Sequence, residues 1–118
     1  MKTKMIKVSE ATNTQLDWLV AKCRGILQEW ANDAGTGRVL RAPSYCRPTT
    51  DRAQAMELVE SEGVCLRRGH SGWWFAYQLT VNDEEVFLVL SATLLVAVAR
   101  CYVASKLGEN VEVPDDLT

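Results

Sequence analysis

The chain has 118 residues, of which 47% are hydrophobic and 24% are charged, and its net charge at pH 7 is -2. This length is typical of one domain with its own core, so we expect a single domain over residues 1–118 that ends in an acidic tail at 109–118. The slight acidic excess argues against the basic surface that nucleic acids and anionic membranes attract, and we expect neither DNA nor a membrane as a partner.

The N-terminal part of the sequence predicts a short strand and an amphipathic helix. Residues 6–8 are typical of a strand, and Asn13 or Thr14 is placed to cap a helix that ends near Arg24. Residues 26–30 either extend this helix or form an irregular turn. The apolar positions of the helix follow the i, i+3, i+4, i+7 spacing, and they are Leu16, Leu19, Val20 and Cys23.

The middle of the chain predicts a second helix that follows a rigid segment. Two prolines make residues 42–50 extended and stiff. A hydroxyl or carboxyl side chain at the end of this segment then caps a helix that ends at Gly63. The candidate caps are Thr49, Thr50 and Asp51.

The C-terminal half predicts an antiparallel meander followed by an apolar helix. We expect strands at 64–67, 73–81 and 85–90. The last helix begins at Ser91 and ends at Gly108, and it is apolar nearly all round. Such a helix lies either beneath a sheet and another helix or against a second subunit. The order of elements therefore predicts an α+β fold in which helices cover an antiparallel sheet, as an α-β-α sandwich.

Residues that usually support catalysis or metal binding are few in this sequence. His70 is its single histidine, and no orienting partner for it is evident. The four cysteines form no C-x-x-C pair, which predicts reduced thiols in the cytoplasm and no metal site. The G-x-S-x-G, H-E-x-x-H and P-loop motifs are absent. We therefore expect no enzymatic activity and no cofactor.

Aromatic side chains provide the candidates for stacking against a ligand. Alternation along the expected strand places Trp73 on one face, with Phe75 and Tyr77, whereas Trp74 lies on the other face. Unless both faces are core, one of these tryptophans is left for an edge, a partner or a ligand. Trp18 lies beside the apolar stripe of the first helix, where an indole either packs or stacks on a purine.

Two further features suit an anionic ligand. The segment from Tyr45 to Asp51 leads into a helix N-terminus, where free N–H groups and the helix dipole attract anions. Thr49 and Thr50 add hydroxyl groups, while Asp51 either accepts a hydrogen bond from a ribose or caps the helix. Arg100, on the apolar last helix, either binds phosphate or forms a structural contact within or between subunits. Together these groups suit a ligand with rings, sugar hydroxyls and phosphates.

Three segments of the chain resemble the phage NinX family in their order and spacing. They are Leu16–Lys22, Pro48–Gln54 and Arg100–Gly108, and Val111–Leu117 is similar to the acidic ending of that family. The resemblance implies an α-β-α sandwich shared with a wider group of small phage proteins. That group includes sponges against the Thoeris defence system, which bind a cyclic ADP-ribose signal without cleaving it.

The resemblance therefore implies an anti-defence homo-oligomer in the host cytoplasm that sequesters a cyclic nucleotide. By the pattern of the group, Trp18 and Trp73 stack on the base and Arg100 binds phosphate. We expect the helix start to meet ribose or phosphate through Tyr45, Thr49, Thr50 and Asp51. The chain departs from the family pattern at Arg52 and at residues 90–93, where a turn with proline is usual.

Two other functions are compatible with the sequence. A phage accessory protein of this composition could bind a host protein through its aromatic strand and apolar last helix. A nucleotide-directed enzyme would need His70 or Asp51 as its base, and a second catalytic group is not evident in the sequence.

Overall fold

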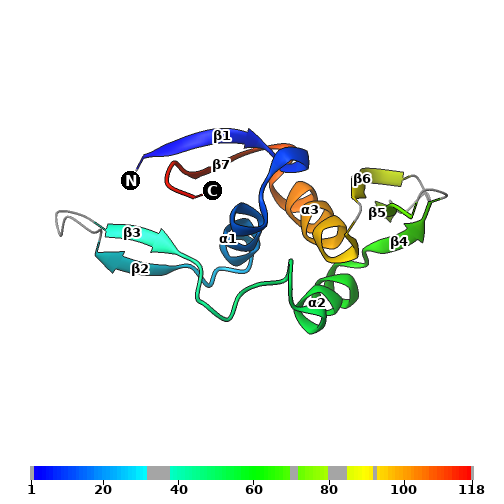
Figure 1. Ribbon diagram of the computed structural model, residues 1–118, viewed down its shortest axis with the longest axis horizontal. Helices are drawn as coiled ribbons and strands as arrows, with labels where there is room; N and C mark the ends of the chain where they lie inside the picture. The colour runs from blue at the N-terminus through cyan, green and yellow to red at the C-terminus, as the bar shows by residue number, and fades with distance from the viewer. Residues whose placement is uncertain (1, 32–37, 70–71, 80–84, 92, 118) are drawn as a thin grey trace.

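The computed structural model describes residues 2–31, 38–69, 72–79, 85–91 and 93–117 (Figure 1). These residues form helices and antiparallel strands in one domain, which confirms the α+β class. In chain order the elements are β1 (Thr3–Lys7), the short 3-10 helix η1 (Val8–Glu10), α1 (Asn13–Cys23), β2 (Gln28–Ala31), β3 (Arg38–Arg41), α2 (Arg52–Glu62), β4 (Cys65–Arg68), β5 (Trp74–Leu79), β6 (Glu85–Ser91), α3 (Leu94–Leu107) and β7 (Asn110–Pro114).

The described strands are divided among three small antiparallel sheets. One pairs β1 with β7, a second is the β2-β3 hairpin, and the third has the order β4-β5-β6. In Figure 1 the hairpin lies at one end of the molecule and the three-stranded sheet at the other, with the helices between them. The expected meander is therefore present as a three-stranded sheet, and α3 packs on it, with Val59 of α2 beside the same buried cluster.

Helix α3 forms the centre of the molecule. It packs against α1 and α2 as well as against β5 and β6 of the three-stranded sheet. Ala97 and Cys101 form a buried cluster with Ala76 of β5, because small side chains allow the helix to approach the sheet closely. Of the two positions expected for this apolar helix, it takes the one beneath a sheet and other helices. A partner surface made from its buried residues would require the core to open.

Helix α3 begins later than the sequence predicts. Ser91 was the expected start, but it is the last residue of β6, where it pairs with Trp74. The N-cap is Thr93, whose N–H donates a hydrogen bond to the Ser91 hydroxyl oxygen over 3.2 Å. No helix in the described part of the chain is long and apolar enough to cross a membrane.

The acidic tail contains a strand that its composition did not predict. Strand β7 pairs with β1, so the two ends of the described chain lie side by side (Figure 1). Val111 and Val113 point into the core, whereas Glu112 between them is exposed. The alternation is that of a half-buried strand, but it is short and lies among acidic residues, so it is difficult to recognise in the sequence.

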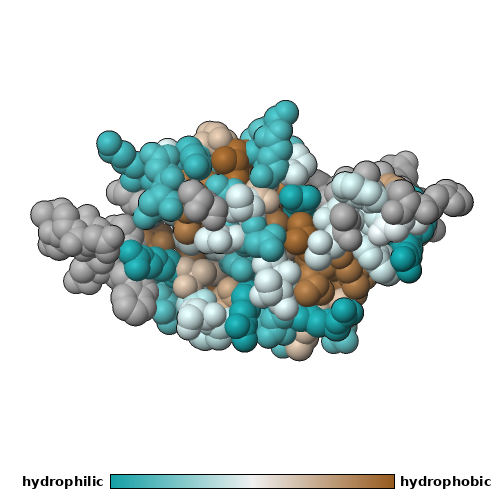
Figure 2. Space-filling model, viewed as in Figure 1, coloured by the Kyte–Doolittle hydropathy of each residue, from teal (hydrophilic) through white to brown (hydrophobic). Residues whose placement is uncertain are grey.

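On the face shown in Figure 2, hydrophilic residues lie over β1.

Two boundaries near α1 also differ from the sequence prediction. The cap of α1 is Thr12, one residue earlier than expected, because Thr12 and Gln15 form a reciprocal capping box. Residues 26–30 do not extend this helix, since Gln28 begins β2 and pairs with Arg41 of β3. Further along the chain, Asp51 caps α2 as one of the predicted candidates.

Candidate ligand-binding cavity

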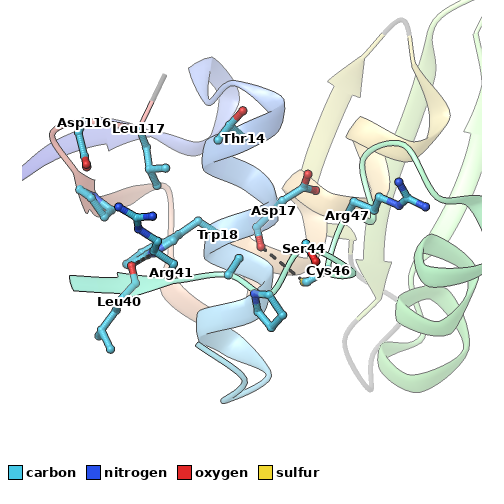
Figure 3. Close-up of a pocket in the computed structure, with 13 residues that line it drawn as sticks. Thr14, Asp17, Trp18, Leu40, Arg41, Ser44, Cys46, Arg47, Asp116 and Leu117 are labelled. Carbon is cyan, nitrogen blue, oxygen red and sulfur yellow. Dashed lines mark hydrogen bonds between the residues drawn. The ribbon is translucent and has the colours of Figure 1, made fainter. Parts of the chain in front are cut away.

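A cavity of about 430 Å³ opens between α1, the β3 strand and the last residues of the chain (Figure 3). Its wall includes residues of α1, of β3 and the proline-bearing segment that follows, and of the turn after β7. These segments are distant in sequence and meet only in the folded chain. The volume lies within the range of about 300–1,000 Å³ that is typical of small-molecule sites.

Trp18 forms part of the cavity wall and also joins two elements. Its indole Nε1–H donates a hydrogen bond to the carbonyl oxygen of Leu40 over 3.0 Å, which ties β3 to α1. The Nζ atom of Lys22 lies 5.6 Å from the centre of the ring. The side chain is only 4% exposed, so a ligand in the cavity would contact a part of the ring and not its whole face.

Charged side chains of both signs line the cavity. Arg41 and Asp116 lie on the side of the chain end, whereas Arg47 and Asp17 lie toward α2 (Figure 3). The Arg47 N–H donates to Gln54 Oε1 over 2.8 Å, which fixes the segment that carries this arginine to α2. Guanidinium groups bind phosphate well, and carboxylates accept hydrogen bonds from sugar hydroxyls. The cavity therefore suits a ligand that has both kinds of group.

Asp17 connects α1 to the segment before α2. Its Oδ1 atom accepts hydrogen bonds from the Thr49 N–H over 3.1 Å and from the Thr49 hydroxyl over 2.9 Å. Burial raises the pKa of the Asp17 carboxyl above its ordinary value, and the two bonds from Thr49 oppose this effect. Thr49 is buried, so its hydroxyl supports the cavity wall and does not line the cavity.

The chain end closes one side of the cavity, and Gln15 holds it there. The amide Nε2 of Gln15 donates to the carbonyl oxygen of Leu117 over 3.2 Å, while its Oε1 accepts from the Thr12 N–H over 2.9 Å. One buried amide thus caps α1 and anchors the chain end. Pro114, Asp116 and Leu117 line the cavity as a result.

The other predicted residues of the α2 start lie outside this cavity. Tyr45 is 63% exposed and lines two neighbouring hollows. The Thr50 hydroxyl donates to the Arg47 carbonyl over 3.4 Å. Asp51 Oδ1 accepts from the Gln54 N–H over 3.2 Å. Because this carboxylate already takes up a free N–H at the start of α2, the helix start is less suited to a second anion.

Trp73 lies far from Trp18 in the fold. It directly precedes β5, in the sheet on the opposite side of α3 from α1 (Figure 1). Its side chain is 42% exposed and does not line the cavity. One copy of the chain therefore does not place the two tryptophans around a common ligand.

Arg100 is directed toward the N-terminal part of the chain. Its Nη2 atom donates to the carbonyl oxygen of Ala11, the C-cap of η1, over 3.2 Å. Its Nε atom is buried and has no hydrogen-bond partner among the described residues. Burial lowers the pKa of this guanidinium, and the negative charge of Glu109 partly offsets that effect. Arg100 does not line the cavity, so its contacts in one chain are structural.

Sequence reasoning missed Arg41, Asp17 and Asp116 as cavity residues, whereas Arg47 lies in the Tyr45–Asp51 segment that was expected to attract an anion. Arg41 precedes the proline-bearing segment and Arg47 lies within it, and the pairing of β2 with β3 together with the bonds of Trp18 to Leu40 and of Asp17 to Thr49 brings that segment to α1. Asp17 precedes Trp18 within a family-like segment, which was the one signal in the sequence. His70 lies outside the described residues.

The described residues offer little for metal binding or nucleophilic catalysis. Nowhere among them do three or more His, Cys, Asp or Glu side chains gather as a metal site would require. Cys46 is the thiol at the cavity wall within the described chain, and its Sγ donates to the Asp17 carbonyl oxygen over 3.7 Å. Burial raises the pKa of Cys46, which keeps the thiol protonated and unreactive at neutral pH.

Comparison with known proteins gives one family match. Residues 7–106 match the model of the family described as Bacteriophage P22, NinX. No curated protein matches the chain. The matched range includes α1, α2, the three-stranded sheet and nearly all of α3, but it ends before β7.

Proposed function

Because the chain belongs to the phage P22 NinX family and is thus a phage accessory protein, we propose that it sequesters a nucleotide immune signal in the host cytoplasm. The ligand is a cyclic nucleotide of the cyclic ADP-ribose type, held without cleavage. The observation that carries the proposal is the cavity itself, in which an indole, two arginines and two carboxylates surround about 430 Å³. Family membership by itself does not define a function.

The chemistry of the cavity supports a ligand with phosphates and a sugar. Arg41 and Arg47 supply two guanidinium groups for phosphate, and Thr14 and Ser44 add hydroxyls. Asp17 and Asp116 supply carboxylate oxygens that accept hydrogen bonds from ribose. The Trp18 ring offers an apolar contact for the base. Charge-assisted hydrogen bonds of about 1.5–3 kcal/mol each would give most of the affinity, since the ring is largely buried.

The same geometry supports binding without cleavage. The thiol at the wall is protonated, as described above, and the hydroxyls that line the cavity have no histidine beside them in the described chain. A nucleophile needs an adjacent base or a lowered pKa to react. The protein therefore acts as a reservoir that removes the signal from solution.

Trp73 takes part in this proposal only through a second copy of the chain. It lies on the other side of α3 from the cavity, so a ligand held between Trp18 and Trp73 would bridge two subunits. A homo-oligomer of this kind would form or tighten when the ligand binds. Light scattering of the purified protein with and without ligand measures this directly.

The proposal is tested by ligand binding followed by chemical recovery. The purified protein is incubated with cyclic ADP-ribose isomers and with cyclic oligonucleotides, and thermal unfolding is recorded for each. Each complex whose unfolding temperature has shifted is then denatured, and mass spectrometry identifies the compound that is released. We expect a shift of several degrees with one compound, which is recovered intact.

A matched pair of variants localises the site. Arg41→Ala and Arg47→Ala should each reduce the shift, because each removes a cation from the cavity. Arg24→Ala is the control, since Arg24 is also exposed but pairs with Glu57 outside the cavity over 3.7 Å. Absence of a shift with every compound, or recovery of an altered product, would overturn the proposal.

A further inference from the structure

Tyr45 lies at the tip of a tight turn between β3 and α2. The Cys46 N–H donates to the carbonyl oxygen of Pro43 over 2.9 Å, which closes the turn, and Gln54 Nε2 donates to the carbonyl oxygen of Tyr45. The backbone at Tyr45 is therefore fixed, whereas its side chain is 63% exposed and has no hydrogen-bond or cation partner among the described residues. A tyrosine ring in this position can contact a ligand at a small cost in conformational entropy.

The Tyr45 hollow, of about 380 Å³, adjoins the cavity and is lined by Gln28, residues 41–44 and Tyr45. Residues 41–44 line the cavity as well, so the two spaces share most of one wall. A second hollow, on the α2 side of Tyr45, shares only the buried Cys46 with the cavity among the described residues. A ligand that extends past the Arg41 edge of the cavity therefore meets the Tyr45 hollow and not the second one.

The cavity by itself offers little ring surface to a base. Trp18 is only 4% exposed, and its indole is fixed by the hydrogen bond to Leu40. Trp73 lies on the other side of α3 (Figure 1). In one copy of the described chain, Tyr45 is therefore the exposed aromatic side chain that adjoins the cavity. Arg41 lies on the wall that the cavity and the Tyr45 hollow share, so a nucleotide whose phosphate is bound there has the Tyr45 hollow beside it.

We infer that Tyr45 stacks on the base of the bound nucleotide and forms the outer wall of the ligand site. This role rests on the proposed function, since the cavity must hold a nucleotide for Tyr45 to contact it. The sugar and the phosphates lie in the cavity, with Arg41 at its edge, and Tyr45 covers the part of the base that extends into the Tyr45 hollow. Trp18 contacts the base from inside the cavity. One copy of the chain then makes two aromatic contacts, so binding selects a nucleotide over a sugar phosphate that lacks a base.

Isothermal titration of the full chain with the same cyclic ADP-ribose isomers and cyclic oligonucleotides tests this role. For each compound that wild-type protein binds, Tyr45→Ala should weaken binding by about 5- to 150-fold, the range for loss of one stacking contact. Tyr45→Phe keeps the ring and should bind as tightly as wild type. Met5→Ala is the control, because Met5 is 60% exposed but lies on β1, outside the cavity and the Tyr45 hollow. Circular dichroism confirms that each variant is folded.

Nuclear magnetic resonance distinguishes direct contact with Tyr45 from an indirect effect on the fold. The chain has three tyrosines, so ring-labelled tyrosine gives few signals, and Tyr45→Phe identifies those of Tyr45. A base stacked on Tyr45 should shift the signals of that ring upfield. The signals of Tyr77 and Tyr102, which line neither the cavity nor the Tyr45 hollow, should keep their positions.

The outcomes separate the role of Tyr45 from the sequestration itself. Unchanged affinity in Tyr45→Ala, while wild-type protein still binds, would overturn the role of Tyr45 and leave the sequestration standing. Weaker binding in Tyr45→Ala without a shift of the Tyr45 signals would also overturn it. So would loss of binding in Trp73→Ala but not in Tyr45→Ala, which would place the base between two subunits. If wild-type protein binds none of the compounds, the sequestration and the role of Tyr45 are both wrong.

Discussion

Individual side chains in this protein have roles that depend on what surrounds them. Arg100 carries a charge on the central helix, yet its described hydrogen bond goes to the backbone of Ala11 and its Nε atom is buried without a partner among the described residues. Asp17 is also charged and half-buried, but its Oδ1 atom accepts two hydrogen bonds, one from the N–H and one from the hydroxyl of Thr49. The two residues differ because a carboxylate with two donors is better compensated than a guanidinium with one acceptor.

Arg100→Met distinguishes a structural arginine from a ligand-binding one. Methionine keeps an apolar stem of similar length and removes the buried Nε atom. We therefore expect cyclic nucleotide binding to be unchanged and the free energy of unfolding to change by no more than about 1–2 kcal/mol. Thermal shift with the bound compound and urea unfolding measure the two effects. Loss of ligand binding in the folded variant would assign Arg100 to the site, as the family resemblance implies.

Asp17→Asn should change how stability depends on pH. The pKa of Asp17 is raised in the folded state above the ordinary value of 3.8, so the folded protein holds this proton more tightly than the unfolded chain. Asp17 therefore makes stability fall as pH rises from 3.8 through the raised pKa, and its charge destabilises the fold above that window. The asparagine variant should lack this component. Urea unfolding of both proteins from about pH 4 to about pH 7 measures it, and parallel curves would contradict the prediction.

The cysteines should react with thiol reagents at very different rates. Cys101 is fully buried, and burial raises its pKa to about 11. Cys46 is buried as well, whereas Cys23 and Cys65 are partly exposed. Iodoacetamide labelling followed by peptide mass spectrometry should modify Cys65 well before Cys101 in the native protein. In urea the difference should disappear, and rapid labelling of native Cys101 would be inconsistent with this packing.

At the scale of elements, short polar contacts determine where helices begin. Helix α1 starts after a full capping box, α2 starts after Asp51, and α3 starts after Thr93 without a side-chain cap. The third helix does not need one, because its apolar residues are buried on several sides. Capping thus contributes more to α2, which buries only Ala55 and Leu58.

Asp51→Ala should destabilise the protein by about 0.5–2 kcal/mol, the usual cost of losing an N-cap. The Asp51 carboxylate accepts from the Gln54 N–H over 3.2 Å and from Gln54 Nε2 over 3.2 Å, and alanine removes both bonds. Urea unfolding gives the difference in free energy. Thr50→Ala is the matched control, since Thr50 is exposed and its described hydroxyl bond is a long one. An equal effect of both substitutions would show that capping is not the cause.

At the scale of the molecule, the two chain ends complete the fold. Strand β7 lies beyond the range matched by the NinX family, yet it buries Val111 and Val113 and leads into the cavity wall. The β1-β7 pair covers one side of the helical centre, and the three-stranded sheet covers another (Figure 1). Residues 7–106, the range that matches the family, therefore lack part of the core and part of the cavity wall.

A chain that ends at Glu109 should be much less stable than the full chain. Burial of each valine contributes about 1.5–3 kcal/mol, and typical domains are stable by only about 5–15 kcal/mol. The truncated chain should also lose the cavity wall that Leu117 and Asp116 form. Circular dichroism with urea measures its unfolding, and Glu112→Ala in the full chain is the control because Glu112 is exposed on the same strand. A midpoint equal to that of the full chain would contradict the prediction.

Local patterns predicted most of the elements but few of the cavity residues. The period of Leu16, Leu19 and Val20 indicated α1, and the aromatic run indicated β5, since both depend only on neighbours in sequence. Strand β2 was missed because residues 28–31 show little alternation and form a strand only by pairing with β3. Trp18 was predicted because it lies beside an apolar stripe and within the family-like segment Leu16–Lys22. Arg41 was missed because nothing near it in sequence marks it, whereas Arg47 lies in the segment before α2 that the sequence indicated as an anion-binding feature.

The sequence by itself determined the family, the α+β class, the three helices and the apolar character of α3. These features follow from residue type and spacing along the chain, which local backbone and burial preferences convert into elements. Tertiary structure alone decided that Trp18 lies on the cavity and Trp73 far from it, that Arg100 turns to Ala11, and that the acidic tail pairs with β1. Those outcomes depend on contacts between segments that are many residues apart. Such contacts form only when α3 is buried and the other elements close around it.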